Sequence, residues 1–135
     1  MKDNKHTVLT FPNLNMEARL IPNDVEIYGG ECGYANGYVG VNKDHPLYGV
    51  EYNEIFSKIS IHGGLTYSGH IKNRKHNPTQ VNWVDEDLWW FGFDTFHSGD
   101  RIDYLSKDYC LREVAYLACQ IASFSKTKQT VNEKE

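Results

Sequence analysis

The residues best suited to chemistry gather in one short stretch, GFDTFHSGD, at positions 92–100. Asp94, His97 and Asp100 recur at every third position, directly after a run of aromatic residues. Imidazole can exchange a proton near neutral pH, and a neighbouring carboxylate can orient the ring for that exchange. The two aspartates could equally satisfy turn amides, as Asx side chains often do. The spacing therefore indicates either acid–base chemistry or a turn.

A second stretch, HGGLTYSGH at positions 62–70, pairs a histidine with two glycines. Gly63 and Gly64 follow His62 and have no Cβ, so the backbone can bend there and approach a ligand closely. In an extended strand, His62, Gly64 and Thr66 would share one sparse polar face, and Tyr67 would point the other way. This pattern is typical of a pocket floor, although a bulged edge strand with a surface histidine fits it too.

A third stretch, NKDHPLYG, places His45 directly before Pro46, which disfavours the helical region for the histidine. A histidine held in an extended loop either faces a ligand or is an exposed spacer. Tyr48, a few residues on, could stack on a nucleobase. The ligand-binding candidates from these stretches are Gly63, Gly64, Thr66, Tyr67, His45 and Tyr48.

Three kinds of site are compatible with these residues. Imidazole and carboxylate groups suit Zn, Mn or Fe, although the spacing matches no strong metal signature such as H-E-x-x-H. Without a metal, two histidines could act as acid and base on a phosphodiester, although the paired H-x-[ST] repeats of two-histidine phosphoesterases are absent. Without catalysis, aromatic rings and glycine amides could hold a nucleotide. The candidate catalytic or metal-binding residues are His62, His97, Asp94 and Asp100.

The whole chain sets limits on these hypotheses. Its 135 residues predict one globular domain over 7–125, with a flexible segment at 1–6 and a polar tail at 126–135. A net charge of −4 argues against a nucleic-acid polymer as partner. We expect a cytoplasmic protein, because the start of the chain lacks an apolar signal region and no stretch is long enough for a membrane helix. Three cysteines without C-x-x-C spacing suggest free thiols.

The expected elements form an α+β domain with a mostly antiparallel sheet and one long C-terminal amphipathic helix packed on it. The continuous apolar run around 88–93 predicts a buried central strand. Asn36-Gly37 predicts a hairpin turn, and residues 52–56 a short helical turn. Apolar residues at helical spacing predict the last helix, with Ser106 or Asp108 as its cap. Those apolar positions are Cys110, Val114, Leu117, Ala118 and Ile121.

Three strings, GYVGVNKDHPLYG, HGGLTYSG and WWFGFDTFHSGD, followed by an amphipathic helix, resemble a family of small bacteriophage and prophage proteins. The likeness covers roughly residues 33–122. It implies a phage accessory protein that acts against host defence in the cytoplasm of the infected bacterium. Phe96 departs from the pattern, which more often has a small residue there. The family-like positions are His45, Pro46, Gly49, His62, Gly63, Gly64, Thr66, Asp94, His97, Gly99 and Asp100.

The leading hypothesis is an enzyme that hydrolyses a phosphoester or nucleotide-like signalling ligand. His62 and His97 would be the acid–base pair, and Asp94 or Asp100 would orient them or hold a divalent metal. The alternative is a non-catalytic sponge, which we expect to be a homo-oligomer, that sequesters a cyclic or modified nucleotide. A third class is an inhibitor that binds a host protein.

Overall fold

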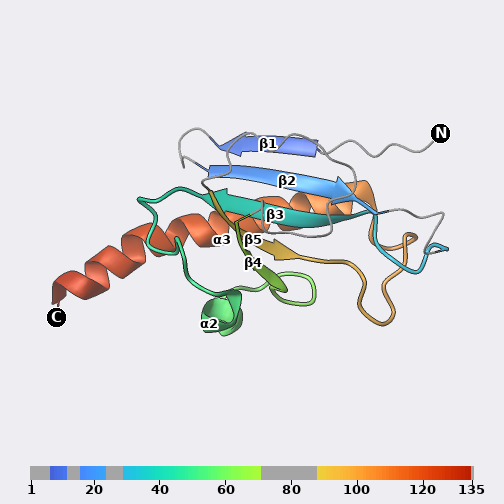
Figure 1. Cartoon of the computed structure of the whole chain (residues 1–135). Helices are drawn as coiled ribbons and strands as arrows, with labels where there is room; N and C mark the ends of the chain where they lie inside the picture. The colour runs from blue at the N-terminus through green and yellow to red at the C-terminus, as the bar shows by residue number, and fades with distance from the viewer. Residues whose placement is uncertain (1–6, 12–15, 24–28, 71–87, 135) are drawn as a thin grey trace.

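The computed structural model describes residues 7–11, 16–23, 29–70 and 88–134, with side chains described up to Phe124. The strands are β1 (Thr7–Phe11), β2 (Met16–Pro22), β3 (Ala35–Val41), β4 (Tyr67–Gly69) and β5 (Trp89–Phe93). The helices are α2 (Tyr52–Ile55), the 3₁₀ turn η1 (Phe56–Lys58) and α3 (Lys107–Lys134). All the strand pairs are antiparallel, and α3 runs across one face of the sheet (Figure 1). This arrangement confirms the α+β class.

The aromatic run forms β5, an interior strand as expected. In the strand order β1-β2-β3-β5-β4, β5 pairs with β3 on one side and β4 on the other. Phe91 lies opposite Val39 on β3 and opposite Ser68 on β4. Phe91 and Phe93 are buried against α3, and Trp90 is buried on the opposite face of the sheet. Both faces of β5 are therefore covered, which explains its nearly continuous apolar sequence.

Helix α3 buries the stripe that its sequence predicts. All five predicted apolar positions, from Cys110 to Ile121, are fully buried against the helix-facing side of the sheet. Burying each of the larger side chains contributes about 1.5–3 kcal/mol, so this interface contributes substantially to stability. Ser106 caps the helix, because its Oγ accepts the Tyr109 N–H at 3.2 Å. The helix continues to Lys134, through the segment expected to be a polar tail.

Two local predictions are wrong. Asn36-Gly37 lies inside β3, opposite Ile21 and Leu20 of β2, and forms no hairpin turn. Gly37 is needed there because a Cβ would lie 2.5 Å from the Phe93 ring. The stretch from His62 is also not a strand until Tyr67, since residues 62–63 form a turn. The expected alternation of faces from His62 to Thr66 therefore does not exist.

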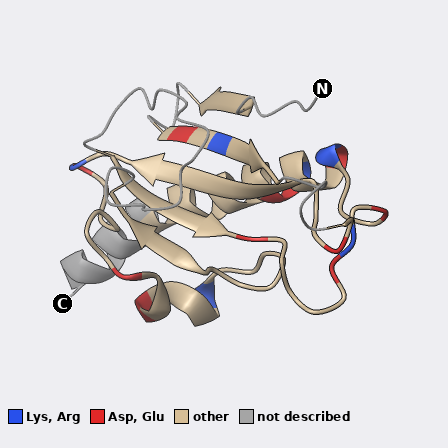
Figure 2. Cartoon of the chain, turned by 45° about the vertical axis from the view of Figure 1, so that its right-hand side comes forward, with Lys and Arg blue, Asp and Glu red and all other residues tan. Residues whose placement is uncertain are grey.

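No helix among the described residues is long and apolar enough to cross a membrane. Cys32, Cys110 and Cys119 are thiols that form no disulfide with one another, and the first two are buried. Acidic and basic positions are interspersed along the described part of the ribbon in Figure 2.

Candidate functional site

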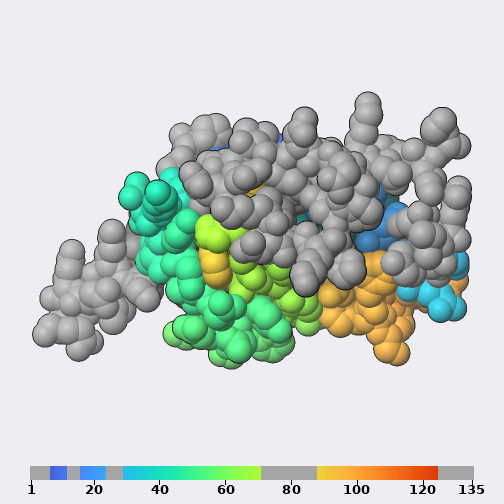
Figure 3. Space-filling view, viewed as in Figure 1, coloured from blue at the N-terminus to red at the C-terminus, as the bar shows by residue number. Residues whose placement is uncertain are grey.

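The pairing of β4 with β5 brings the two histidine stretches together. The backbone N–H of Thr66 donates to the Gly92 carbonyl at 2.8 Å, which extends the ladder beyond β4. The chain before β4 therefore runs beside the loop after β5. Figure 3 shows these two segments, yellow-green and orange, in contact on one face of the molecule.

The loop after β5 is fixed to the start of β3 by Thr95, which is completely buried. Its backbone N–H donates to Asn36 Oδ1 at 3.0 Å, and its hydroxyl donates to the Ala35 carbonyl at 3.0 Å. Gly33 N–H donates to the Thr95 carbonyl at 2.8 Å, and a Cβ at Gly33 would lie 2.5 Å from Thr95 Cβ. A loop held this firmly is a rigid support for functional side chains.

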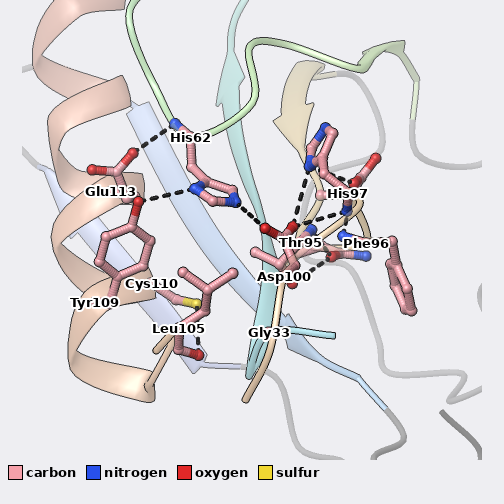
Figure 4. A network of polar contacts seen from close by, with 12 residues as sticks. Gly33, His62, Thr95, Phe96, His97, Asp100, Leu105, Tyr109, Cys110 and Glu113 are labelled. Atoms are coloured by element: carbon pink, nitrogen blue, oxygen red, sulfur yellow. Dashed lines mark hydrogen bonds and ion pairs between the residues drawn. The ribbon is translucent and has the colours of Figure 1, made fainter. Parts of the chain in front are cut away.

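Asp100 is the centre of the site, and its carboxylate is only 8% exposed. Oδ1 accepts from His62 Nε2 at 2.9 Å. Oδ2 accepts the His97 backbone N–H at 2.8 Å and lies 3.2 Å from His97 Nδ1 (Figure 4). One buried carboxylate is therefore shared by two imidazoles that come from separate loops.

Helix α3 holds His62 from the other side. Tyr109 Oη lies 3.0 Å from His62 Nδ1, and Glu113 Oε1 accepts the His62 backbone N–H at 2.8 Å. These partners assign the ring proton to Nε2, which donates to Asp100, and the Tyr109 hydroxyl donates to Nδ1. Burial and the negative charge of Glu113 raise the pKa of Tyr109, so the phenol remains a donor at neutral pH. Neither Tyr109 nor Glu113 is predicted from the sequence, where the only signal of the pair is its i, i+4 spacing on the helix.

His97 is the exposed member of the cluster, with 35% of its side chain accessible. Its ring packs on the backbone of Gly63, where a Cβ would lie 2.3 Å from His97 Cε1. Gly64 is similarly covered by the ring of Phe56, and both glycines have positive φ, at 69° and 82°. The two glycines allow close approach, and the groups that approach them in the structure are side chains of the chain itself.

Asp94 is the outer carboxylate. Its Oδ1 accepts the Phe96 backbone N–H at 3.1 Å, which is the turn role that the sequence left open. The same oxygen lies 3.5 Å from His97 Nδ1, and about a third of the side chain is exposed. Asp94 is therefore close to His97 but is not part of the buried network around Asp100.

His45 lies elsewhere, and its ring is bound by the backbone. Its Nδ1 accepts the Leu47 N–H at 3.0 Å, and its Nε2 donates to the Ile121 carbonyl at 3.1 Å. Burial lowers the pKa of His45, which favours the neutral ring that these two hydrogen bonds require. His45 is thus neither a ligand-facing residue nor an exposed spacer but a link between its loop and α3.

Tyr48 and Tyr67 belong to a separate aromatic group around His70. The Tyr48 ring lies 5.8 Å from the ring of His70 and 6.2 Å from that of Trp89. The Tyr67 hydroxyl donates to the His70 carbonyl at 3.1 Å. Tyr48, His70 and Trp89 lie together at the start of β5, whereas Tyr67 is opposite Gly92 near its end and only its hydroxyl reaches His70. The Asp100 cluster follows the other end of the strand.

The cluster of His62, His97 and Asp100 can act in two ways. Each residue offers one ligand atom, and these atoms lie within 4.8 Å of one another, as in a metal site. The same atoms form two imidazole–carboxylate contacts, as in an acid–base centre. Asp94, expected in the metal site, is outside this group of three.

Comparison with known proteins gives no match: no family model, curated protein or solved structure is significantly similar to this chain. The likeness to bacteriophage proteins is therefore carried by the sequence strings alone, and the phage context stays a prediction.

Proposed function

We propose that the protein hydrolyses a phosphoester bond in a small nucleotide-like ligand at the cluster of His62, His97 and Asp100. The observation that carries the proposal is the buried Asp100 carboxylate, shared by one inner and one exposed imidazole. A carboxylate of this kind orients an imidazole and stabilises the imidazolium that forms during proton transfer.

His97 is the group that exchanges the proton. With Nδ1–H directed at Asp100, its Nε2 is the free acceptor, and within the described residues no hydrogen bond is found at that nitrogen. Water gives a proton to Nε2 as its oxygen attacks phosphorus. The phosphorus–oxygen bond to the leaving group then breaks, and the leaving oxygen takes the proton back from the imidazolium. Such acid–base assistance typically contributes about 10²–10⁴-fold in rate.

His62 has a different role from the one that the sequence suggested. Its two ring nitrogens are bound by Asp100 and Tyr109, so neither is free to exchange a proton with a ligand. His62 instead fixes the Asp100 carboxylate in the position that orients His97. The expected pair of catalytic histidines becomes one proton-exchanging residue and one positioning residue.

The ligand class follows from the hypotheses on the sequence. We infer a signalling nucleotide as the substrate and an accessory, anti-defence role in the cytoplasm of an infected bacterium, because the three strings resemble bacteriophage proteins. A small ligand is favoured over a nucleic-acid polymer by the net charge of −4.

The test is turnover of a ligand panel by the wild type, His97→Ala and His45→Ala. The panel contains cyclic dinucleotides, cyclic oligonucleotides and ADP-ribose derivatives, and mass spectrometry after heat denaturation detects the products. We expect a new product mass with the wild type and His45→Ala, and a rate at least about 100-fold lower with His97→Ala. Full activity of a folded His97→Ala variant would contradict the assignment, and no product from any ligand would contradict the function.

Sequestration is the second candidate, favoured by the half-buried aromatic group of Tyr48, His70 and Trp89, whose rings could stack on a nucleobase. A sponge would deplete the ligand from solution and release it unchanged after denaturation. Sedimentation of the same samples would show whether the sponge is a homo-oligomer.

A further inference from the structure

We propose that His62, His97 and Asp100 bind one divalent transition-metal ion. The proposal rests on the same centre as the proposed function and deepens it, because a bound ion would give the centre a second way to activate water. Two imidazoles and a carboxylate are a common donor set for Zn²⁺ and its neighbours.

The separations between the donor atoms fit an ion. His62 Nε2 lies 2.9 Å from one oxygen of Asp100, and His97 Nδ1 lies 3.2 Å from the other. Metal bonds of about 2.0–2.2 Å in a tetrahedral site hold neighbouring ligand atoms at about 3.4 Å from one another. The two contacts with Asp100 are close to this separation, and the three donor atoms together lie within 4.8 Å of one another, so the side chains would move inward to close around an ion.

The charge of the cluster favours a cation. Among the described residues, the ion-pair partners of Asp100 are His62 and His97, which are charged only when protonated. With both rings neutral, this carboxylate, which is 8% exposed, is compensated by hydrogen bonds from His62 and His97 and by no full positive charge among the described residues. A buried charge is stabilised further by a charged partner, and a divalent ion would supply one.

Groups outside the cluster already fix the donors in place. With a metal on Nε2, the His62 proton would move to Nδ1 and be donated to Tyr109 Oη, which lies 3.0 Å away. Glu113 holds the backbone of His62 in both states. Such outer partners orient the ligating imidazole and typically change metal affinity by about 10–100-fold when they are removed.

The donor set also predicts which ions bind. Two imidazole nitrogens and one carboxylate favour Zn²⁺, Co²⁺, Ni²⁺ or Fe²⁺ over Mg²⁺ and Ca²⁺, which prefer oxygen ligands. A bound ion lowers the pKa of its water and so generates hydroxide at neutral pH. In that state, water activation would pass from His97 Nε2 to the ion.

The first test is calorimetric titration of the chelator-treated, metal-free protein with Zn²⁺, and with Mg²⁺ as the contrasting ion. Absorption spectra with Co²⁺ would report the coordination geometry. We expect one Zn²⁺ per chain and at least about 100-fold weaker binding in Asp100→Asn and His62→Ala. The matched controls are Asp103→Asn, an exposed carboxylate of the same loop, and His70→Ala, and both should bind as the wild type does.

Circular dichroism would show whether each variant is folded. If Asp100→Asn unfolds, His97→Gln provides another variant that lacks a metal-binding side chain. The proposal is wrong if the folded wild type binds no stoichiometric Zn²⁺ or Co²⁺. It is also wrong if the Asp100, His62 and His97 variants bind Zn²⁺ as tightly as the wild type does. Turnover that persists without metal, in a protein that binds none, would overturn the metal site and leave the proposed function intact. One bound Zn²⁺ without turnover of any ligand would support the metal site and contradict the function.

Discussion

Two histidines lie beyond one end of strand β5 and one lies at the other end, and the two regions differ in what binds the ring nitrogens. At the far end, His62 and His97 are bound by Asp100 and Tyr109, side chains that can gain or lose a proton. At the near end, the His70 ring packs edge-on against Trp89 and its Nδ1 donates to the Leu88 carbonyl at 3.1 Å.

His45 resembles His70, because its ring is also bound by backbone amide and carbonyl groups. These groups carry no ionisable proton, so they hold one tautomer of the ring and stabilise the fold. A carboxylate can share a proton with the ring or exchange it for a metal ion. The type of partner, more than the presence of histidine, therefore separates the candidate site from a structural link.

The largest effect should come from Gly63→Ala, compared with Gly49→Ala. Both glycines have positive φ, at 69° and 83°, which costs an alanine about 1–2 kcal/mol. Only at Gly63 would the new Cβ meet His97, at 2.3 Å, whereas nothing lies within 4 Å at Gly49. Urea denaturation should show a loss of about 3 kcal/mol for Gly63→Ala, and Zn²⁺ titration should show at least tenfold weaker binding. Equal Zn²⁺ affinity of the two variants would mean that His97 is not held by Gly63.

The next effect concerns the hydroxyl that supports His62. Tyr109→Phe removes the 3.0 Å contact with Nδ1 and should weaken Zn²⁺ binding about tenfold. Tyr116→Phe is the matched control, since Tyr116 lies on the same helix with more than half of its side chain exposed. Isothermal titration of both variants measures the difference. If the two variants bind Zn²⁺ equally, Tyr109 does not position the ring.

The third prediction concerns pH at His45, whose ring is bound by the backbone. His45→Ala should lower the free energy of unfolding at pH 8 by about 1–2 kcal/mol, because two backbone groups lose their partner. Burial lowers the pKa of His45 in the folded chain. Below about pH 6.5, the His45 ring is therefore protonated more fully in the unfolded chain than in the folded chain. His45 therefore destabilises the wild type progressively as pH falls, and the difference from His45→Ala should shrink between pH 8 and 5. Urea denaturation across this range measures it, and a difference that grows as pH falls would contradict the assigned neutral ring.

The smallest effect is expected at Asp94. An asparagine keeps an oxygen for the Phe96 N–H, and the lost charge is about a third exposed and lies 3.5 Å from His97. Asp94→Asn should therefore change stability by less than about 0.5 kcal/mol and Zn²⁺ affinity by no more than about twofold. A loss as large as that of Asp100→Asn would place Asp94 in the centre itself.

The sequence by itself determined the elements whose signals are local. The apolar spacing of α3, the Ser106 cap and the aromatic run of β5 each depend on neighbours within a few turns or residues, and the structure confirms them. The α+β class follows from the same signals. Asn36-Gly37 was misread because packing of Phe93 on Gly37, 56 positions away, outweighs the local turn preference.

The candidate site also has features that the sequence predicts and features that only the tertiary structure decides. The sequence named His62, His97 and Asp100 from their residue types, but it also named His45 and Tyr48 and could not rank Asp94 against Asp100. Only the pairing of β4 with β5 decides that His62 meets a carboxylate 38 residues later. Only the packing of α3 adds Tyr109, because its contact with His62 spans 47 positions and the spacing on the helix does not predict it. The residue types determine which chemistry is possible. The long-range contacts of the fold decide which groups share a proton, because a hydrogen bond forms only between groups that the fold brings close together.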